Sequence, residues 1–77
     1  MSKPRVFNIR IEVTLDEDGQ YLATATEWPC SERGATRGKA AAAVVESLLA
    51  GWGLLEEDGS VVDGVTTNVT VVDGTRN

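Results

Sequence analysis

Histidine is absent from the 77 residues of this chain, and cysteine occurs once, as Cys30. Histidine has an unperturbed pKa near neutrality, and it is the side chain that most often serves as a general base or a metal ligand. Catalytic triads and zinc sites that depend on histidine are therefore excluded. A single thiol can form neither an internal disulfide nor a cysteine-rich metal site. We predict that the protein is not an enzyme and that it uses no metal or cofactor.

Long apolar segments are missing as well. The longest apolar region with helical spacing contains Glu46 and Ser47, so no run of about 20 apolar residues is present that could cross a membrane. The segment that follows Pro4 alternates apolar with polar residues, whereas a signal peptide needs a continuous apolar stretch. We therefore expect a soluble, cytoplasmic protein that does not bind membranes.

Aromatic residues are few: two tryptophans, one tyrosine and one phenylalanine. The core must therefore be built from small and branched aliphatic side chains. A chain of this length forms one domain, predicted here to span residues 1–77, and buries only roughly 60% of its unfolded surface. Domains of this size often gain stability by association, so we predict a homo-oligomer, with a dimer favoured.

The net charge of −5 is distributed unevenly. All but one of the seven cationic residues lie at or before Lys39, and the segment 40–74 contains none. That segment carries six carboxylates, at Glu46, Glu56, Glu57, Asp58, Asp63 and Asp73. A protein that binds a phosphate backbone needs lysine and arginine on its contact face, so direct binding to nucleic acid is not expected. The acidic surface serves either solubility or the attraction of a basic partner.

Periodicity predicts most of the secondary structure. Apolar and polar residues alternate over 6–15, which predicts a half-buried strand, and the turn 16–20 joins it to a second strand over 21–26. The loop 27–35 could add a third short strand. Alternation over 65–72 predicts the last strand, preceded by an acidic turn over 56–60 and a short Val61-Val62 pair.

One helix is predicted between the loop and the last strand. Thr36 is a candidate N-cap, and Gly53 is the candidate left-handed residue that ends the helix. Residues of one helical face recur at spacings of three and four, namely Ala40, Ala41, Val44, Val45, Leu48, Leu49 and Trp52. We predict that this stripe packs on the apolar face of residues 7–15. The predicted fold class is α+β, a small antiparallel sheet packed on one helix.

Three local features have a structural and a functional interpretation. Asp16 and Asp18 resemble the start of a calcium loop, but Gly19 and Glu27 do not fall at the positions that such a loop requires. Cys30 is either a small core residue, which we favour, or a reactive thiol. Trp28 is either a lid over the core or an exposed anchor for a partner protein.

The order of these features resembles the N-terminal domain of HicB-type antitoxins. In that family a hairpin around a D-x-D-G-x-Y turn is followed by a P-G-C-x-x-x-G-x-T loop and an alanine-rich helix. The corresponding stretches here are 16–21, 29–36 and 37–40. The likeness covers residues 5–52, and the region 61–73 matches the closing strand. The resemblance implies the order strand, strand, strand, helix, strand, similar to a double-stranded RNA-binding domain or a partial RNase H-like sheet.

The resemblance also implies a function. HicB-like domains bind and block a small basic ribonuclease toxin, HicA, and often form dimers or tetramers. We therefore expect a protein-binding module that docks a small basic partner, without a DNA-binding domain in these 77 residues. The candidate contact residues are Trp28, Glu46, Glu56, Glu57 and Asp58. The alternative is a self-associating structural domain without a toxin partner, in which strand 65–72 pairs across chains.

Overall fold

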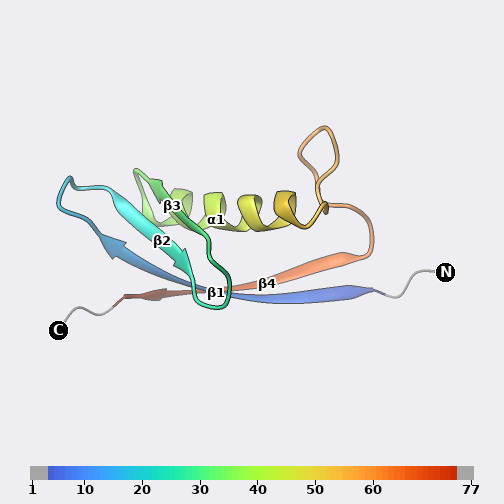
Figure 1. Ribbon diagram of the computed structural model, residues 1–77, viewed down its shortest axis with the longest axis horizontal. Coiled ribbons are helices and arrows are strands. Elements are labelled where there is room, and N and C mark those ends of the chain that lie inside the picture. Colours follow the sequence, from blue (N-terminus) through green and yellow to red (C-terminus); the bar gives the residue numbers. More distant parts are fainter. Residues whose placement is uncertain (1–3, 75–77) are drawn as a thin grey trace.

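The computed structural model describes residues 4–74, which form a four-stranded sheet with a helix packed on one face (Figure 1). The elements follow in the order β1 (Arg5–Leu15), β2 (Tyr21–Ala25), β3 (Ser31–Gly34), α1 (Arg37–Gly51) and β4 (Val65–Asp73). The predicted α+β class and element order are confirmed, and the third strand is present. In this part of the chain, no helix is both long and apolar enough to span a membrane.

The sheet is mixed, which corrects the expectation of an antiparallel sheet. Its strand order is β3-β2-β1-β4. β1 pairs antiparallel with β2, and β2 pairs antiparallel with β3. In contrast, β4 runs parallel to β1, from Val65 opposite Arg5 to Asp73 opposite Val13. Parallel neighbours need a long crossover, which α1 and the loop after it supply. Alternation reports the faces of a strand but not its direction, so the sequence pattern did not reveal this pairing.

Both predicted ends of α1 are confirmed. The hydroxyl of Thr36 accepts a hydrogen bond from the backbone N–H of Lys39 at 3.1 Å. At the other end, Gly53 adopts a φ of 74°, and its N–H donates to the carbonyl of Ala50 at 3.1 Å. The N–H of Leu54 donates to the carbonyl of Leu49 at 2.9 Å. These two bonds form a Schellman motif, and Leu54 is buried next to it.

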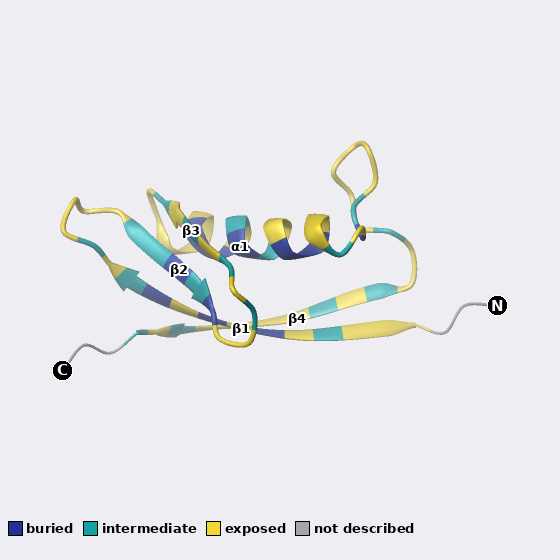
Figure 2. Cartoon of the chain, viewed as in Figure 1, coloured by how far each residue is buried: buried dark blue, intermediate teal, exposed yellow. Residues whose placement is uncertain are grey.

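The core lies between α1 and strands β1 and β2 (Figure 2). β1 contributes the large side chains, whereas β2 and the first half of α1 contribute mostly alanines. The buried cluster consists of Ile9, Ile11, Val13, Ala23, Ala25, Ala40, Ala41, Val44 and Leu48. Leu15 was expected on the buried face but is 55% exposed at the end of β1. Because alanines have short side chains, the backbone of α1 can lie close to the sheet.

β3 and α1 come into particularly close contact at Gly34. A Cβ atom on Gly34 would lie 2.6 Å from the backbone nitrogen of Ala40 and 2.9 Å from its Cα. Real side chains do not approach a backbone this closely. Only glycine, which has no Cβ atom, therefore fits at position 34.

We predict that Gly34→Ala lowers the free energy of unfolding by about 1–3 kcal/mol, because β3 must move away from α1 to make room for the methyl group. Gly51→Ala is the matched control, since a Cβ there meets nothing within 4 Å. Alanine at this helical position should raise stability by up to about 1 kcal/mol. Urea denaturation followed by circular dichroism measures both variants. Equal effects in the two variants would contradict the close contact.

Candidate functional site

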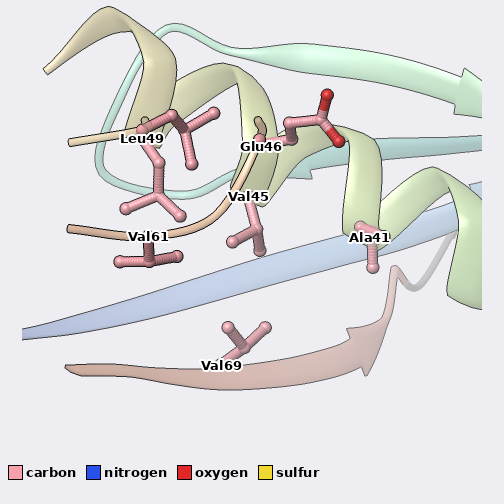
Figure 3. Close-up of a pocket in the computed structure, with 9 residues that line it drawn as sticks. Ala41, Val45, Glu46, Leu49, Val61 and Val69 are labelled. Atoms are coloured by element: carbon pink, nitrogen blue, oxygen red, sulfur yellow. The ribbon is translucent and has the colours of Figure 1, made fainter. Parts of the chain in front are cut away.

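An apolar groove opens between α1, the loop after it and β4 (Figure 3). It is lined by Ala41, Ala42, Val45, Glu46, Leu49, Leu55, Gly59, Val61 and Val69. Its volume is about 350 Å³, near the lower end of the roughly 300–1,000 Å³ typical of ligand pockets. Glu46 is the charged residue among those that line it. The groove can therefore accept apolar side chains beside one carboxylate.

The position of α1 leaves this groove open. The parallel register places Val69 beside Ile9 and Val71 beside Ile11, on the face of the sheet that carries α1. Ile9 and Ile11 are buried, but Val69 and Val71 are 40% and 42% exposed. The helix packs mainly over β3, β2 and β1, so Val69 and Val71 on the same face of β4 stay exposed.

A small hairpin-like loop forms the second wall of the groove. Leu55 and Val61 make an isolated antiparallel bridge, and the N–H of Val62 donates to the carbonyl of Leu54 at 3.0 Å. Figure 1 shows this loop projecting beyond the end of α1. The buried Leu54 anchors its base, so the bridge places Leu55 and Val61 against the groove.

The tip of this loop is the acidic turn, defined here as Glu56, Glu57 and Asp58, all of which are exposed. The hydroxyl of Ser60 donates to Asp58 Oδ1 at 2.6 Å, and the N–H of Ser60 donates to the same oxygen at 2.9 Å. These bonds hold the pKa of Asp58 below its ordinary value. Its carboxylate therefore stays ionised to a lower pH than an unbonded aspartate would.

Of the five predicted contact residues, one lines the groove, and three lie in the loop that forms its second wall. Glu46 lines the groove from α1, and the acidic turn is continuous with Gly59, which lines it from the loop. Trp28 is not among the lining residues. Sequence reasoning missed Leu55, Val61 and Val69, although alternation over 65–72 had already placed Val69 on an apolar face. The sequence pattern contains no indication that α1 leaves this face of β4 exposed.

Trp28 belongs to an aromatic cluster. Its ring lies 5.1 Å from that of Trp52 in an edge-to-face arrangement, and Trp52 stacks on Phe7 at 4.9 Å with an interplanar angle of 21°. All three residues are half-buried and pack against the core. Such pairs stabilise by about 0.5–1.5 kcal/mol beyond the area they bury. This geometry favours the interpretation of Trp28 as a lid over the core.

We expect Trp28→Ala to lower the free energy of unfolding by about 2 kcal/mol, because it removes both buried area and the edge-to-face contact. Trp28→Phe keeps an aromatic ring and should lower the free energy of unfolding by less than half as much. Thermal and urea denaturation of the two variants provide the comparison. A Trp28→Ala protein as stable as the original would favour the anchor interpretation instead.

Cys30 is half-buried and packs against the core, with its Sγ atom 3.9 Å from the carbonyl oxygen of Val44. Burial raises the pKa of the Cys30 thiol, and the nearby negative charge of Glu32 raises it further. The thiolate is the reactive form, so this environment makes the thiol less reactive. The geometry agrees with the favoured interpretation of Cys30 as a core residue.

The raised pKa predicts the pH dependence of Cys30 alkylation. The neutral thiol persists to a higher pH in the folded protein, so the rate of reaction with iodoacetamide should begin to rise at a higher pH than for free cysteine. At pH 8 the folded protein should react at least several-fold more slowly than the same chain in denaturant. A folded protein that reacts as fast as free cysteine would contradict this account.

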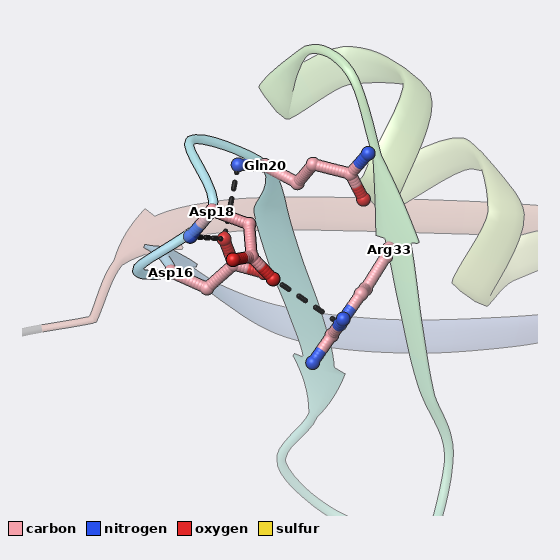
Figure 4. Close-up of polar contacts among 4 residues, drawn as sticks. All are labelled: Asp16, Asp18, Gln20 and Arg33. Atoms are coloured by element: carbon pink, nitrogen blue, oxygen red, sulfur yellow. Dashed lines mark hydrogen bonds and ion pairs between the residues drawn. The ribbon is translucent and has the colours of Figure 1, made fainter.

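The Asp16 turn has a structural role (Figure 4). Asp16 Oδ1 accepts hydrogen bonds from the N–H groups of Asp18 at 2.9 Å and Gln20 at 3.0 Å. Its other oxygen lies 3.6 Å from Nε of Arg33 on β3. The carboxylate thus stabilises the β1–β2 turn and connects it to the sheet edge. Within residues 4–74, no group of three or more histidine, cysteine, aspartate or glutamate side chains is placed to hold a metal ion.

Comparison of the chain with protein-family models, with curated proteins and with solved structures finds no match. The groove and the acidic turn are therefore interpreted from their own geometry and charge.

Proposed function

We propose that this chain is a protein-binding module similar to the HicB-type antitoxins, and that it docks a small basic protein, such as a ribonuclease toxin, at the groove. The observation that carries this proposal is an apolar groove lined by Glu46, whose second wall is the loop that carries the acidic turn. Protein interfaces commonly combine an apolar centre with a charged rim. A basic partner would insert an apolar side chain and direct lysine or arginine toward the carboxylates, which favours association.

The distribution of cations supports a basic partner. Arg33 and Arg37 form ion pairs with Asp16 and Asp73, at the β1–β2 turn and at the start of α1. Glu46 lies further along the helix, about 14 Å from Arg37 at the helical rise of 1.5 Å per residue. This separation exceeds the Debye length of about 8 Å at physiological salt, so Arg37 hardly neutralises the charge at the groove.

The resemblance of residues 5–52 to the HicB-like domain supports the same proposal, since the order of strands and helix is the one that this resemblance implies. The proposed action is cytoplasmic and protein-directed. It requires no catalysis by this chain, because the domain would act by covering the surface of its partner.

The test is co-expression with a short basic protein encoded beside this chain, followed by affinity measurement at several salt concentrations. We predict a complex that weakens as salt rises. Glu46→Lys should weaken it at least tenfold, which corresponds to about 1.4 kcal/mol. Replacing Glu56 and Glu57 together by lysine should act similarly. Asp58 is kept, because its bonds to Ser60 hold the turn.

Glu17→Lys is the matched control, since it makes the same change of charge at an exposed position in the β1–β2 turn, outside the groove. It should alter the affinity by less than about threefold. The proposal fails if no basic protein binds, or if the control and Glu46→Lys weaken binding equally.

A further inference from the structure

β4 leaves one long edge of the sheet unpaired. It is the last strand in the order β3-β2-β1-β4 and has 9 residues, and no strand within residues 4–74 pairs with its other side. Edge strands are usually protected against pairing by lysine, proline, a bulge or short length. The segment 65–72 contains no charge, no proline and no glycine. This edge therefore lacks the common protective features.

The hydrogen bonds to β1 show which backbone groups of β4 face outward. The N–H of Arg5 donates to the carbonyl of Gly64 at 2.7 Å, and the N–H of Gly74 donates to the carbonyl of Val13 at 2.8 Å. Even-numbered residues of β4 therefore point their backbone groups at β1. Because these groups alternate along a strand, the odd-numbered residues Val65, Thr67, Val69, Val71 and Asp73 direct theirs to the open edge.

We propose that a second copy of this chain pairs with this edge, β4 against β4 in antiparallel orientation, about a two-fold axis at Val69. This register pairs all 9 residues of the strand. It also places odd-numbered residues opposite odd-numbered ones, so every outward N–H and C=O meets a partner. A register shifted by one residue would place residues whose N–H and C=O groups point to the open edge opposite residues whose groups point to β1. The proposal is independent of the proposed function, because it rests on the edge and not on the groove.

The side chains and charges fit this self-pairing. Two acidic chains of net charge −5 repel each other, and the uncharged segment 65–72 is where that repulsion is weakest. Val69 would meet its own copy, and Val71 would meet Thr67. At each end, Asp73 would face Val65 of the second copy, whose neighbour on β1 is Arg5. Two strand spacings amount to about 10 Å, so Asp73, which also pairs with Arg37, and Arg5 of the second copy would place opposite charges on the same face at each end.

The two-fold axis would stand perpendicular to the sheet, because residues paired across strands share a face. Both α1 helices would then lie on the same side of a continuous sheet. The two grooves would open toward each other over a floor made by the paired β4 strands. Val69 would contribute to both the floor and the two-fold contact.

The first experiment measures oligomeric state by sedimentation velocity from micromolar to millimolar concentrations. Thr67→Pro removes one outward N–H and blocks the edge, yet leaves the bonds between β4 and β1 intact, since proline is tolerated where the N–H faces solvent. Thr67→Ala is the matched control, because it shortens the same side chain and keeps the N–H. We expect the original chain and Thr67→Ala to be dimers and Thr67→Pro to be a folded monomer by circular dichroism.

The second experiment tests the register in a Cys30→Ala background. Val69→Cys places the new thiols opposite each other, at a Cα separation of about 5.5 Å that a disulfide can span. Val71→Cys is the control, because the two copies of residue 71 would lie about 13 Å apart, beyond disulfide reach. Mild oxidation should cross-link the first variant rapidly and the second at least tenfold more slowly.

A monomeric original chain overturns the proposal, as does a dimer that Thr67→Pro leaves intact. Equal cross-linking of the two cysteine variants overturns the register. If the original chain is a monomer and Thr67→Pro instead abolishes binding of a basic protein, the occupant of the edge is that protein, and self-pairing is wrong. Should the variant fail to fold, the cross-linking pair still decides the question.

Discussion

The close packing of the alanine-rich half of α1 against β2 and β3 controls the arrangement of the molecule. Ala23, Ala40 and Gly34 allow the helix backbone to approach these strands closely. A helix held there does not also cover β4, because its width of about 10 Å equals two strand spacings of about 4.8 Å and therefore reaches only across β3, β2 and β1. The open groove is a consequence of this offset, whereas the free edge follows from the place of β4 at the end of the strand order.

The offset also separates the charges of the protein. Arg33 and Arg37 are paired with carboxylates. Glu46 lines the groove, the acidic turn belongs to the loop that forms its second wall, and the segment 40–74 that carries them contains no cation. The hydrogen bonds from Ser60 position the carboxylate of Asp58, and the buried Leu54 anchors the base of the loop. A partner that binds there would lose little entropy in ordering Asp58.

The sequence predicted the local structure well and the packing less well. Thr36, Gly53 and the Asp16 turn were identifiable because capping and turn formation depend on neighbouring residues alone. The parallel direction of β4 and the exposure of Val69 depend on where distant elements meet, and alternation carries no such information. Gly34 shows the same limit, because its close contact with Ala40 depends on the position of α1. Glu46 and the acidic turn were chosen for charge, and only the fold showed that Glu46 lines a groove whose second wall is the loop that carries the turn.

The parallel pairing of β1 with β4 has a consequence for biosynthesis. Asn8 and Asn68 are 60 residues apart in the chain, yet their side chains are hydrogen-bonded at 3.1 Å. The hairpin and the helix can assemble from nearby segments, but β1 gains its second neighbour only after residues 65–73 have been synthesised. During translation, one side of β1 therefore stays unpaired until β4 has been made. In that interval chaperones or other copies of the chain can bind to it.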